Sequence, residues 1–325
     1  MKTLITGAGG FVGRHLLTHL RNNTDNFLYG TILNDGERRP ELVALCPDLH
    51  ILDLRDPDAV SNLIASVRPD AIYHLAGQPY VPRSFDDPWD TLDNNIHGTL
   101  NLLQAVRELK LSTRILVIGS AEVYGTVPPE QLPLTESTPF APSSPYSVSK
   151  IGQDMLALQY HLAHGIFTIR VRPFNHIGPG QNQRFSISDW ASQIAEAEAG
   201  QRESVVYVGN LSAARDFTDV RDVVRAYSAL LEHGEAGQVY NVCSGTAHTM
   251  HSLLDRLISM SQVPIEVRVA TERFRPVELP ILMGSYARLR ERTGWQPQIS
   301  IEQSLRDVLD EWRQAVAARL ANRIS

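Results

Sequence analysis

The chain has 325 residues, enough for one large domain or two fused domains with a substantial core. Its composition, 43% hydrophobic and 20% charged, is that of an ordinary folded protein, and a formal charge of −6 without any basic run argues against nucleic-acid binding. Only Cys46 and Cys243 are present, which excludes a disulfide framework and a cysteine-based metal site.

No stretch approaches the roughly 18 apolar residues of a membrane span. The opening segment MKTLITGAGG turns glycine-rich after one short apolar run, which is unlike a secretory signal. With only two cysteines, a reducing compartment is the simplest interpretation. We therefore expect a cytoplasmic protein that binds no metal.

The first half of the chain alternates short apolar runs with longer segments of helical spacing. Strands are predicted at 3–6, 27–33, 49–54, 71–77, 114–120 and 167–173. Helices are predicted at 11–20, 91–109 and 144–165. This alternation predicts an α/β fold, a Rossmann-type doubly wound parallel sheet, and the continuous apolar strands fit burial on both faces.

The pattern changes after Pro173. The segment NHIGPGQNQRF (175–185) is punctuated by glycine and proline and is predicted to be a loop. From about residue 246 onward, helices mix with short strands, and the chain ends in an amphipathic helix around 301–317. We expect a smaller C-terminal α/β domain that caps the carboxyl edge of the sheet.

The segment TGAGGFVG (6–13) places Gly7, Gly10 and Gly13 between the first strand and the first helix. Glycines there permit a tight turn and let backbone N–H groups approach a pyrophosphate, to which the helix N-terminus adds partial positive charge. The strand before and the helix after indicate a dinucleotide-binding loop instead of a simple turn.

The end of the second strand leaves the choice of dinucleotide open. An acidic residue there suits the ribose of NAD, and a basic one suits the phosphate of NADP. Asp35 would serve NAD, Arg38 or Arg39 would serve NADP, and at least one of them is expected to be an ordinary solvated side chain. Asp53, which follows the strand-like HIL (50–52), would suit the adenine amino group, although aspartates at strand ends are common.

The segment SPYSVSK (144–150) places Tyr146 and Lys150 one turn apart on one helix face. A lysine ammonium near a phenol favours the phenolate, and would lower the tyrosine pKa from about 10 toward neutrality. Such a tyrosine can exchange a proton with a sugar hydroxyl while hydride moves to or from a nicotinamide. Taken alone, however, such a pair is usually incidental.

Taken together, the glycine loop at residue 7, the Ser120-Ala121-Glu122 turn and the Tyr146/Lys150 pair resemble the extended short-chain dehydrogenase/reductase family in order and spacing. Asn95 in NIHGT matches the family's active-site asparagine. The resemblance runs over essentially the whole chain and implies NADP or NAD as cofactor. It implies that Ser120 hydrogen-bonds the C4 oxygen of a sugar, that Tyr146 is the acid or base, and that Lys150 holds the nicotinamide ribose and tunes Tyr146.

The same resemblance implies a larger set of cofactor-binding residues. They are Gly7, Gly10, Phe11, Val12, Gly13, Asn34, Asp53, Leu54, Leu75, Ala76, Asn95, Tyr146 and Lys150.

Five further segments resemble the GDP-mannose branch of that family, and within it most closely the 4-keto-6-deoxy-sugar reductases. They are HLAGQPYVPRSF (74–85), RPFNHIGPGQ (172–181), RDFTDVRDVVRAY (215–227), VYNVCSG (239–245) and RPVELPILMGSYARLRERTGW (275–295). This narrower resemblance implies a GDP-linked 6-deoxy-4-keto sugar as substrate. Its implied contacts are Gln78, Ser84, Asn175, Arg215, Arg275 and Glu278.

The chemistry of these contacts is sensible, because guanidinium groups suit a pyrophosphate and a carboxylate suits ribose hydroxyls or a guanine edge. The alternative is structural ion pairing, of Arg215 with Asp216 or Asp219, and of Arg275 with Glu278.

The resemblance further implies two functional domains and a dimer. The expected NAD(P)-binding domain comprises residues 1–172 and 212–245, and the expected nucleotide-sugar-binding domain comprises 173–211 and 246–325. The helices at 91–109 and 144–164 would pair with their symmetry mates in a homodimeric four-helix bundle. Part of that contact is expected from Leu156, Leu158 and Leu162.

Glu122 bears on two related activities. In sugar-nucleotide 4,6-dehydratases, a glutamate at this place removes the C5 proton, and many such enzymes carry an aspartate before it as the acid for the departing hydroxide. Here the preceding residue is Ala121, which cannot donate a proton. A reductase needs no C5 base. If the turn is extended, the side chains of Ser120 and Glu122 point to the same side.

The second strand also lacks the arginines with which GDP-mannose dehydratases bind NADP tightly. A dehydratase keeps its cofactor through the catalytic cycle, whereas a reductase must exchange it. Weak cofactor binding therefore fits a reductase. We therefore expect reduction of the C4 ketone of GDP-4-keto-6-deoxy-D-mannose to GDP-D-rhamnose with NAD(P)H. The alternative is 4,6-dehydration of GDP-mannose with Glu122 as the C5 base, and epimerisation at C4 is weaker. A non-catalytic dinucleotide sensor is disfavoured, since sensing needs only the glycine loop.

Overall fold

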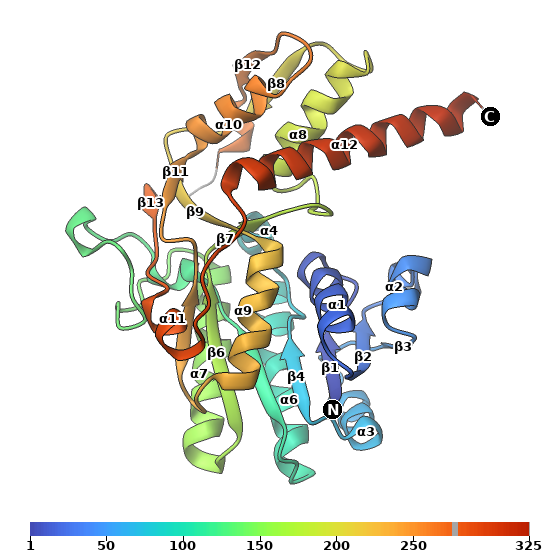
Figure 1. Ribbon diagram of the computed structural model, residues 1–325. Coiled ribbons are helices and arrows are strands. Elements are labelled where there is room, and N and C mark those ends of the chain that lie inside the picture. Colours follow the sequence, from blue (N-terminus) through green and yellow to red (C-terminus); the bar gives the residue numbers. More distant parts are fainter. Residues whose placement is uncertain (275–278, 325) are drawn as a thin grey trace.

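The computed structural model describes residues 1–274 and 279–324 (Figure 1). Seven strands form one parallel sheet in the order β10-β6-β5-β4-β1-β2-β3. The chain fills this sheet outward from β1 in one direction and then outward from β4 in the other, as in a doubly wound fold. The strands are β1 (Lys2–Thr6), β2 (Phe27–Ile32), β3 (Asp48–Ile51), β4 (Ala71–His74), β5 (Arg114–Ile118), β6 (Phe167–Pro173) and β10 (Val239–Val242).

Helices cover both faces of the sheet with separate apolar cores. One face packs against α1 (Phe11–Asn23), α2 (Pro40–Leu45), α9 (Val220–His233) and α11 (Ala287–Thr293). The other face packs against α3 (Pro57–Val67), α6 (Gly98–Glu108) and α7 (Pro145–His164). The expected α/β fold with a doubly wound parallel sheet is therefore confirmed.

A second group of elements lies beyond the carboxyl ends of these strands, at the top of Figure 1. Strand β9 (Ala214–Asp219) pairs with β7 (Asn175–Ile177), β11 (Ala247–Thr249) and β13 (Ile281–Leu282). Strand β8 (Val205–Val208) packs with three helices around a separate apolar core, and the exposed strand β12 (Glu266–Val269) pairs with β8 in parallel. These helices are α8 (Ser186–Glu198), α10 (Met250–Ser259) and α12 (Ile301–Ile324).

The helix predicted at 91–109 is divided. Helix α5 (Pro88–Leu92) leads into a π-helical turn at Asp93–His97, and α6 follows. The Thr99 hydroxyl donates to the carbonyl oxygen of Asn95, four residues earlier, over 2.7 Å. Such turns often mark functional positions.

Four predicted strands end earlier than expected, and residues that follow each of them line a cavity. The strands predicted to end at 33, 54, 77 and 120 end at Ile32, Ile51, His74 and Ile118. The segment predicted as a loop at 175–185 begins with β7. The remaining short elements are α4 (Val81–Asp86) and the 3-10 turns Asp35–Glu37, Ala121–Tyr124, Pro129–Gln131 and Thr271–Arg273.

No helix within 1–274 and 279–324 is long and apolar enough to cross a membrane. In the same part of the chain, no three His, Cys, Asp or Glu side chains are grouped so as to hold a metal ion. Cys46 and Cys243 are both buried free thiols.

Candidate active site

A cavity of about 1070 Å³ lies at the carboxyl edge of the sheet. It runs from the glycine loop past the Ser120–Glu122 turn to β7 and the loop at 183–187. Single small-ligand pockets usually occupy about 300–1,000 Å³. The cavity therefore has room for a dinucleotide and for part of a second ligand, and it lies where the direction of winding changes, the usual ligand site of this architecture.

The glycine loop forms a cradle of bare backbone. A Cβ atom at Gly7 would lie 3.0 Å from the backbone of Ala76, and one at Gly13 would lie 2.4 Å from the carbonyl oxygen of Gly7. Gly7 also has a φ of 70°, which side chains disfavour. Since α1 begins at Phe11, directly after this loop, the site fits a pyrophosphate held by backbone N–H groups at a helix N-terminus.

Most of the residues expected to bind the cofactor meet in this cavity. Those that line it are Gly7, Gly10, Phe11, Val12, Gly13, Asp53, Leu54, Leu75, Ala76, Tyr146 and Lys150. Asn34 and Asn95 are not part of the lining. The side chain of Asn34 is exposed and donates a long hydrogen bond of 3.5 Å to Glu37.

Asn95 is fully buried and shapes the cavity from behind. Its Oδ1 accepts from the backbone N–H of Gln78 at 2.7 Å, and its Nδ2 donates to Ser149 Oγ at 2.8 Å and to the Gln78 carbonyl at 3.2 Å. The amide therefore ties the loop after β4 to the helix that carries Tyr146. This geometry favours a positioning role for Asn95, and its contact with the cofactor stays a prediction.

Helix α7 is fixed at both its start and its middle. Ser144 and Ser147 form a reciprocal capping box at its N-terminus, which places Tyr146 in the first turn. Farther along, the buried carboxylate of Asp154 is bound by Arg170 and Arg172 of β6, each at 2.7 Å. The helix is thus held rigidly against the sheet.

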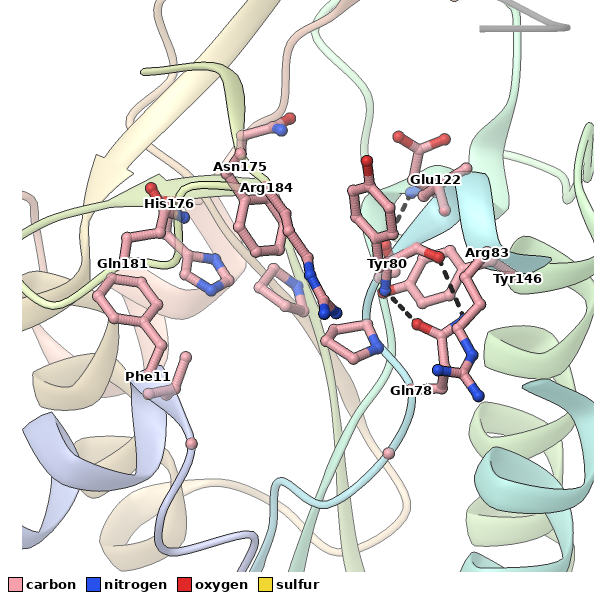
Figure 2. A pocket seen from close by; sticks show the side chains of 18 of the residues that line it. Phe11, Gln78, Tyr80, Arg83, Glu122, Tyr146, Asn175, His176, Gln181 and Arg184 are labelled. Carbon is pink, nitrogen blue, oxygen red and sulfur yellow. Dashed lines mark hydrogen bonds between the residues drawn. The ribbon is translucent and has the colours of Figure 1, made fainter. Parts of the chain in front are cut away.

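Tyr146, Ser120 and Lys150 all line the cavity. Figure 2 shows Tyr146 on the same side of the cavity as Glu122 and Gln78. Tyr146 and Ser120 share a hydrogen bond between their hydroxyl groups. The ammonium of Lys150 donates to the carbonyl oxygen of Ile118 at 3.0 Å and lies 5.8 Å from the centre of the Tyr146 ring. The helical spacing of residues 146 and 150 does bring the pair together.

The expectation that Lys150 lowers the pKa of Tyr146 is wrong for this structure. Burial raises the pKa of Tyr146 well above its usual value, and the charge of Glu122 raises it further, against the opposing hydrogen bond from Ser120. Burial also lowers the pKa of Lys150 to about 7. The same dry surroundings that isolate the phenol therefore weaken the charge that was expected to activate it.

A 3-10 turn, Ala121–Tyr124, begins directly after Ser120, so the condition of an extended turn is not met. Ser120 Oγ accepts from the backbone N–H of Glu122 at 3.1 Å. Ala121 is 1% exposed and packs with Val123 and Tyr124 in a small apolar cluster. Ser120 and Glu122 nevertheless both line the cavity.

Of the residues expected to bind substrate, Gln78, Asn175 and Arg215 line the cavity. Ser84 does not: it is fully buried in α4, and its hydroxyl donates to the carbonyl oxygen of Val81 at 2.7 Å. A direct contact of Ser84 with a ligand is therefore not supported by its position. Arg275 and Glu278 lie outside the described residues.

Arg215 is held in place by backbone oxygens. Its Nη1 donates to the carbonyl groups of Ala214 at 2.9 Å and Leu279 at 2.6 Å. The two carboxylates considered as structural partners have other bonds. Asp216 accepts hydrogen bonds from Ser244, Gly245 and Gly284, and Asp219 pairs with Arg221 at 2.7 Å.

Further polar side chains complete the lining. From the motif at 74–85 come Tyr80 and Arg83, and from the segment after Pro173 come His176, Gln181 and Arg184. Figure 2 shows Arg184 reaching into the cavity opposite Gln78 and Tyr146. Four of the five lie within segments that carried the family resemblance, but nothing local distinguishes them from neighbours that point elsewhere.

A glycine cradle and a Ser–Tyr–Lys set in one cavity define an extended short-chain dehydrogenase/reductase. The sequence model described as GDP-mannose 4,6 dehydratase matches residues 4–308. The chain belongs to that family of nucleotide-sugar enzymes.

Individual relatives show the same relationship. The chain is 42% identical to GDP-6-deoxy-D-mannose reductase of Pseudomonas aeruginosa over 97% of this chain and 98% of the relative. It is 32% identical to GDP-mannose 4,6 dehydratase 2 of Arabidopsis thaliana over 81% of this chain and 71% of the relative. Among solved structures, RMD from Pseudomonas aeruginosa complexed with NADPH is 41% identical with a TM-score of 0.85, covering 97% of this chain and 99% of that one.

Proposed function

We propose that the protein reduces the C4 ketone of GDP-4-keto-6-deoxy-D-mannose to GDP-D-rhamnose, with NADPH or NADH as reductant. The observation that carries the proposal is the match of 42% identity to a GDP-6-deoxy-D-mannose reductase over nearly the full length of both chains. The matching dehydratase of Arabidopsis thaliana is less similar and is covered less completely.

The cofactor would lie along the lining described above. The cradle of Gly7, Gly10 and Gly13 would hold its pyrophosphate, and Lys150 would hold its nicotinamide ribose. A bound reduced dinucleotide supplies the hydride for the ketone.

Tyr146 provides the proton that the reduced C4 oxygen needs. Because burial raises its pKa, Tyr146 carries its proton at neutral pH and is prepared to act as an acid. The Ser120 hydroxyl, hydrogen-bonded to Tyr146, orients the C4 oxygen beside the phenol. Lys150 is not among the groups that shift the pKa of Tyr146, so its proposed role is to hold the nicotinamide ribose.

The nucleotide-sugar would extend from Ser120 toward Gln78, Asn175 and Arg215. In this proposal, the dinucleotide is bound by residues 1–172 and 212–245. The nucleotide-sugar is bound by residues 173–211 and 246–325. Strand β9 belongs to the first range by sequence but pairs with β7, β11 and β13 of the second group. It would therefore carry Arg215 from one unit into the other.

We further propose a homodimer built on α6 and α7. An apolar stripe runs along α7 with a spacing of alternately three and four residues, as in helix bundles. It consists of Val148, Ile151, Met155, Leu158 and Leu162. Val148 is 46% and Leu162 is 73% exposed, whereas Leu156 packs inward against the core. Light scattering at micromolar concentration tests this, and a monomeric mass would refute it.

We propose the cytoplasm as the location, because the reaction consumes NAD(P)H and both cysteines carry free thiols.

A second candidate is 4,6-dehydration of GDP-mannose. The observation that favours it is the position of Glu122, which lines the cavity and whose charge acts on Tyr146. A carboxylate there would be placed to remove a C5 proton. Ala121 disfavours this reaction, because its side chain is buried and cannot protonate the departing hydroxide.

One experiment separates the two reactions. The protein is incubated with GDP-mannose alone, and separately with its 4-keto-6-deoxy product plus NADH or NADPH. We expect oxidation of the reductant only in the second mixture, with GDP-D-rhamnose as product. Consumption of GDP-mannose without added cofactor would contradict the reductase assignment.

A further inference from the structure

Glu37 projects from the 3-10 turn after β2 into the cavity, beside the glycine loop. A Cβ atom at Gly9 would lie 2.7 Å from Oε2 and 3.3 Å from Cβ of Glu37, so the carboxylate occupies space that a side chain at position 9 would need. The other lining residues at this end include Ile32, Leu33 and Asp53. In this fold the ribose next to the adenine lies at the end of the second strand.

The 3-10 turn also separates Glu37 from the acidic residue considered from sequence. A 3-10 helix has three residues per turn, so side chains two positions apart point in different directions. Asp35 is 79% exposed, pairs with Arg38 at 3.2 Å and does not line the cavity. Glu37 is half-buried and does line it.

The cations near this end of the cavity have other partners. Arg38 donates to the carbonyl oxygen of Leu49 at 3.0 Å in addition to its pair with Asp35. Arg55, the one that lines the cavity, makes several hydrogen bonds to Asp53, the shortest of 2.6 Å. Arg39 is exposed and is not part of the lining.

We infer that Glu37 makes this protein prefer NADH to NADPH. This preference rests on the proposed function, in which either NADPH or NADH could serve as reductant. A carboxylate is an acceptor for the two ribose hydroxyls of NADH, and it repels the doubly charged 2′-phosphate of NADPH in a partly desolvated site. The preference for NADH is opposite to the preference suggested by the related structure, which is complexed with NADPH.

The test is a binding measurement that needs no turnover. Dissociation constants for NADH and NADPH are measured by calorimetry for the wild type, Glu37→Gln and Glu41→Gln. Glu41 is an exposed residue of α2 outside the lining and is the matched control. The wild type should bind NADH at least about tenfold more tightly than NADPH. Glu37→Gln should reduce the ratio of the two dissociation constants, mainly by strengthening NADPH binding. Glu41→Gln should leave the ratio unchanged.

Other results overturn the inference. Equal or tighter binding of NADPH by the wild type, or a ratio that Glu37→Gln does not change, would do so. If Arg39→Ala then weakens NADPH, Arg39 is the determinant instead. Tight NADPH binding with reduction of the keto sugar would leave the proposed function intact, whereas a failure to bind either dinucleotide would overturn both.

Discussion

The two ends of the cavity are built in different ways. At the dinucleotide end, the pyrophosphate cradle comes from one continuous segment, 6–13, and backbone shape decides what fits. At the sugar end, Gln78, Ser120, Tyr146, Asn175 and Arg215 come from five separated segments, and burial decides how they behave. Ligand binding at the dinucleotide end depends on the absence of Cβ atoms from the glycine loop. The chemistry at the sugar end depends on hydrogen bonds and on how burial shifts the pKa values of its side chains.

The largest effect is expected at the sugar end. Tyr146→Phe should lower turnover by about 10²–10⁴-fold, the usual contribution of a positioned acid, while dinucleotide affinity stays nearly unchanged. Steady-state kinetics and calorimetric titration with the dinucleotide measure the two quantities. Tyr160→Phe, on the same helix but outside the lining, is the control and should retain the wild-type rate. Near-full activity of Tyr146→Phe would mean that another group is the acid.

At the dinucleotide end, shape should dominate. Gly13→Ala places a Cβ atom 2.4 Å from the carbonyl oxygen of Gly7, so the loop must shift. We expect a loss of about 1–3 kcal/mol of unfolding free energy, as for other overpacked sites, together with weaker dinucleotide binding. Gly10→Ala is the comparison, because its Cβ would lie 3.2 Å from the same oxygen. Equal losses for the two variants would show that close packing does not control this end.

Lys150 tests whether burial controls the sugar end. The unfolded chain keeps this lysine protonated up to its usual pKa of 10.5, whereas the folded protein does so only below about 7. At pH 7 and below, burial of this lysine therefore lowers the free energy of unfolding. The destabilisation becomes smaller as the pH rises toward 10.5. In the cofactor-free protein, Lys150→Met should be more stable than the wild type at pH 7, by on the order of 2 kcal/mol.

Denaturant unfolding at pH 7 and at about pH 9.5 measures this difference, which should shrink at the higher pH. Lys110→Met removes an exposed lysine and should show no comparable trend. A stability difference for Lys150→Met that does not depend on pH would indicate that the buried amine is not the cause.

The smallest effect is expected at Glu122. Changing it to Gln keeps the shape and removes the base, and a reductase never breaks the C5–H bond. Ketone reduction should therefore fall by less than about tenfold, with Glu130→Gln, exposed and outside the lining, as the control. A loss of about 10²–10⁴-fold, or solvent deuterium at C5 of a product made from GDP-mannose, would identify Glu122 as the base of a dehydratase.

The sequence by itself determined the features that depend on local chain geometry. The alternation of strands and helices predicted the parallel sheet, because each element must bury an apolar face at its own period. The glycine spacing predicted the cradle, and the spacing of Tyr146 and Lys150 predicted that both face one site. Ser120 and Glu122 also reached the cavity as expected, although through a 3-10 turn.

Only the tertiary structure decided what these groups experience. The pKa of Tyr146 rises because segments remote in sequence exclude water from it, which a helical spacing cannot reveal. The amide of Asn95 forms hydrogen bonds with Gln78 and Ser149, so it supports the wall of the cavity. Glu37 lines the cavity and Asp35 does not, because the 3-10 turn points the two side chains in different directions and Gly9 leaves space for the carboxylate of Glu37. Local patterns fix which residues share a face, but desolvation and close approach arise between segments that meet only in the folded chain.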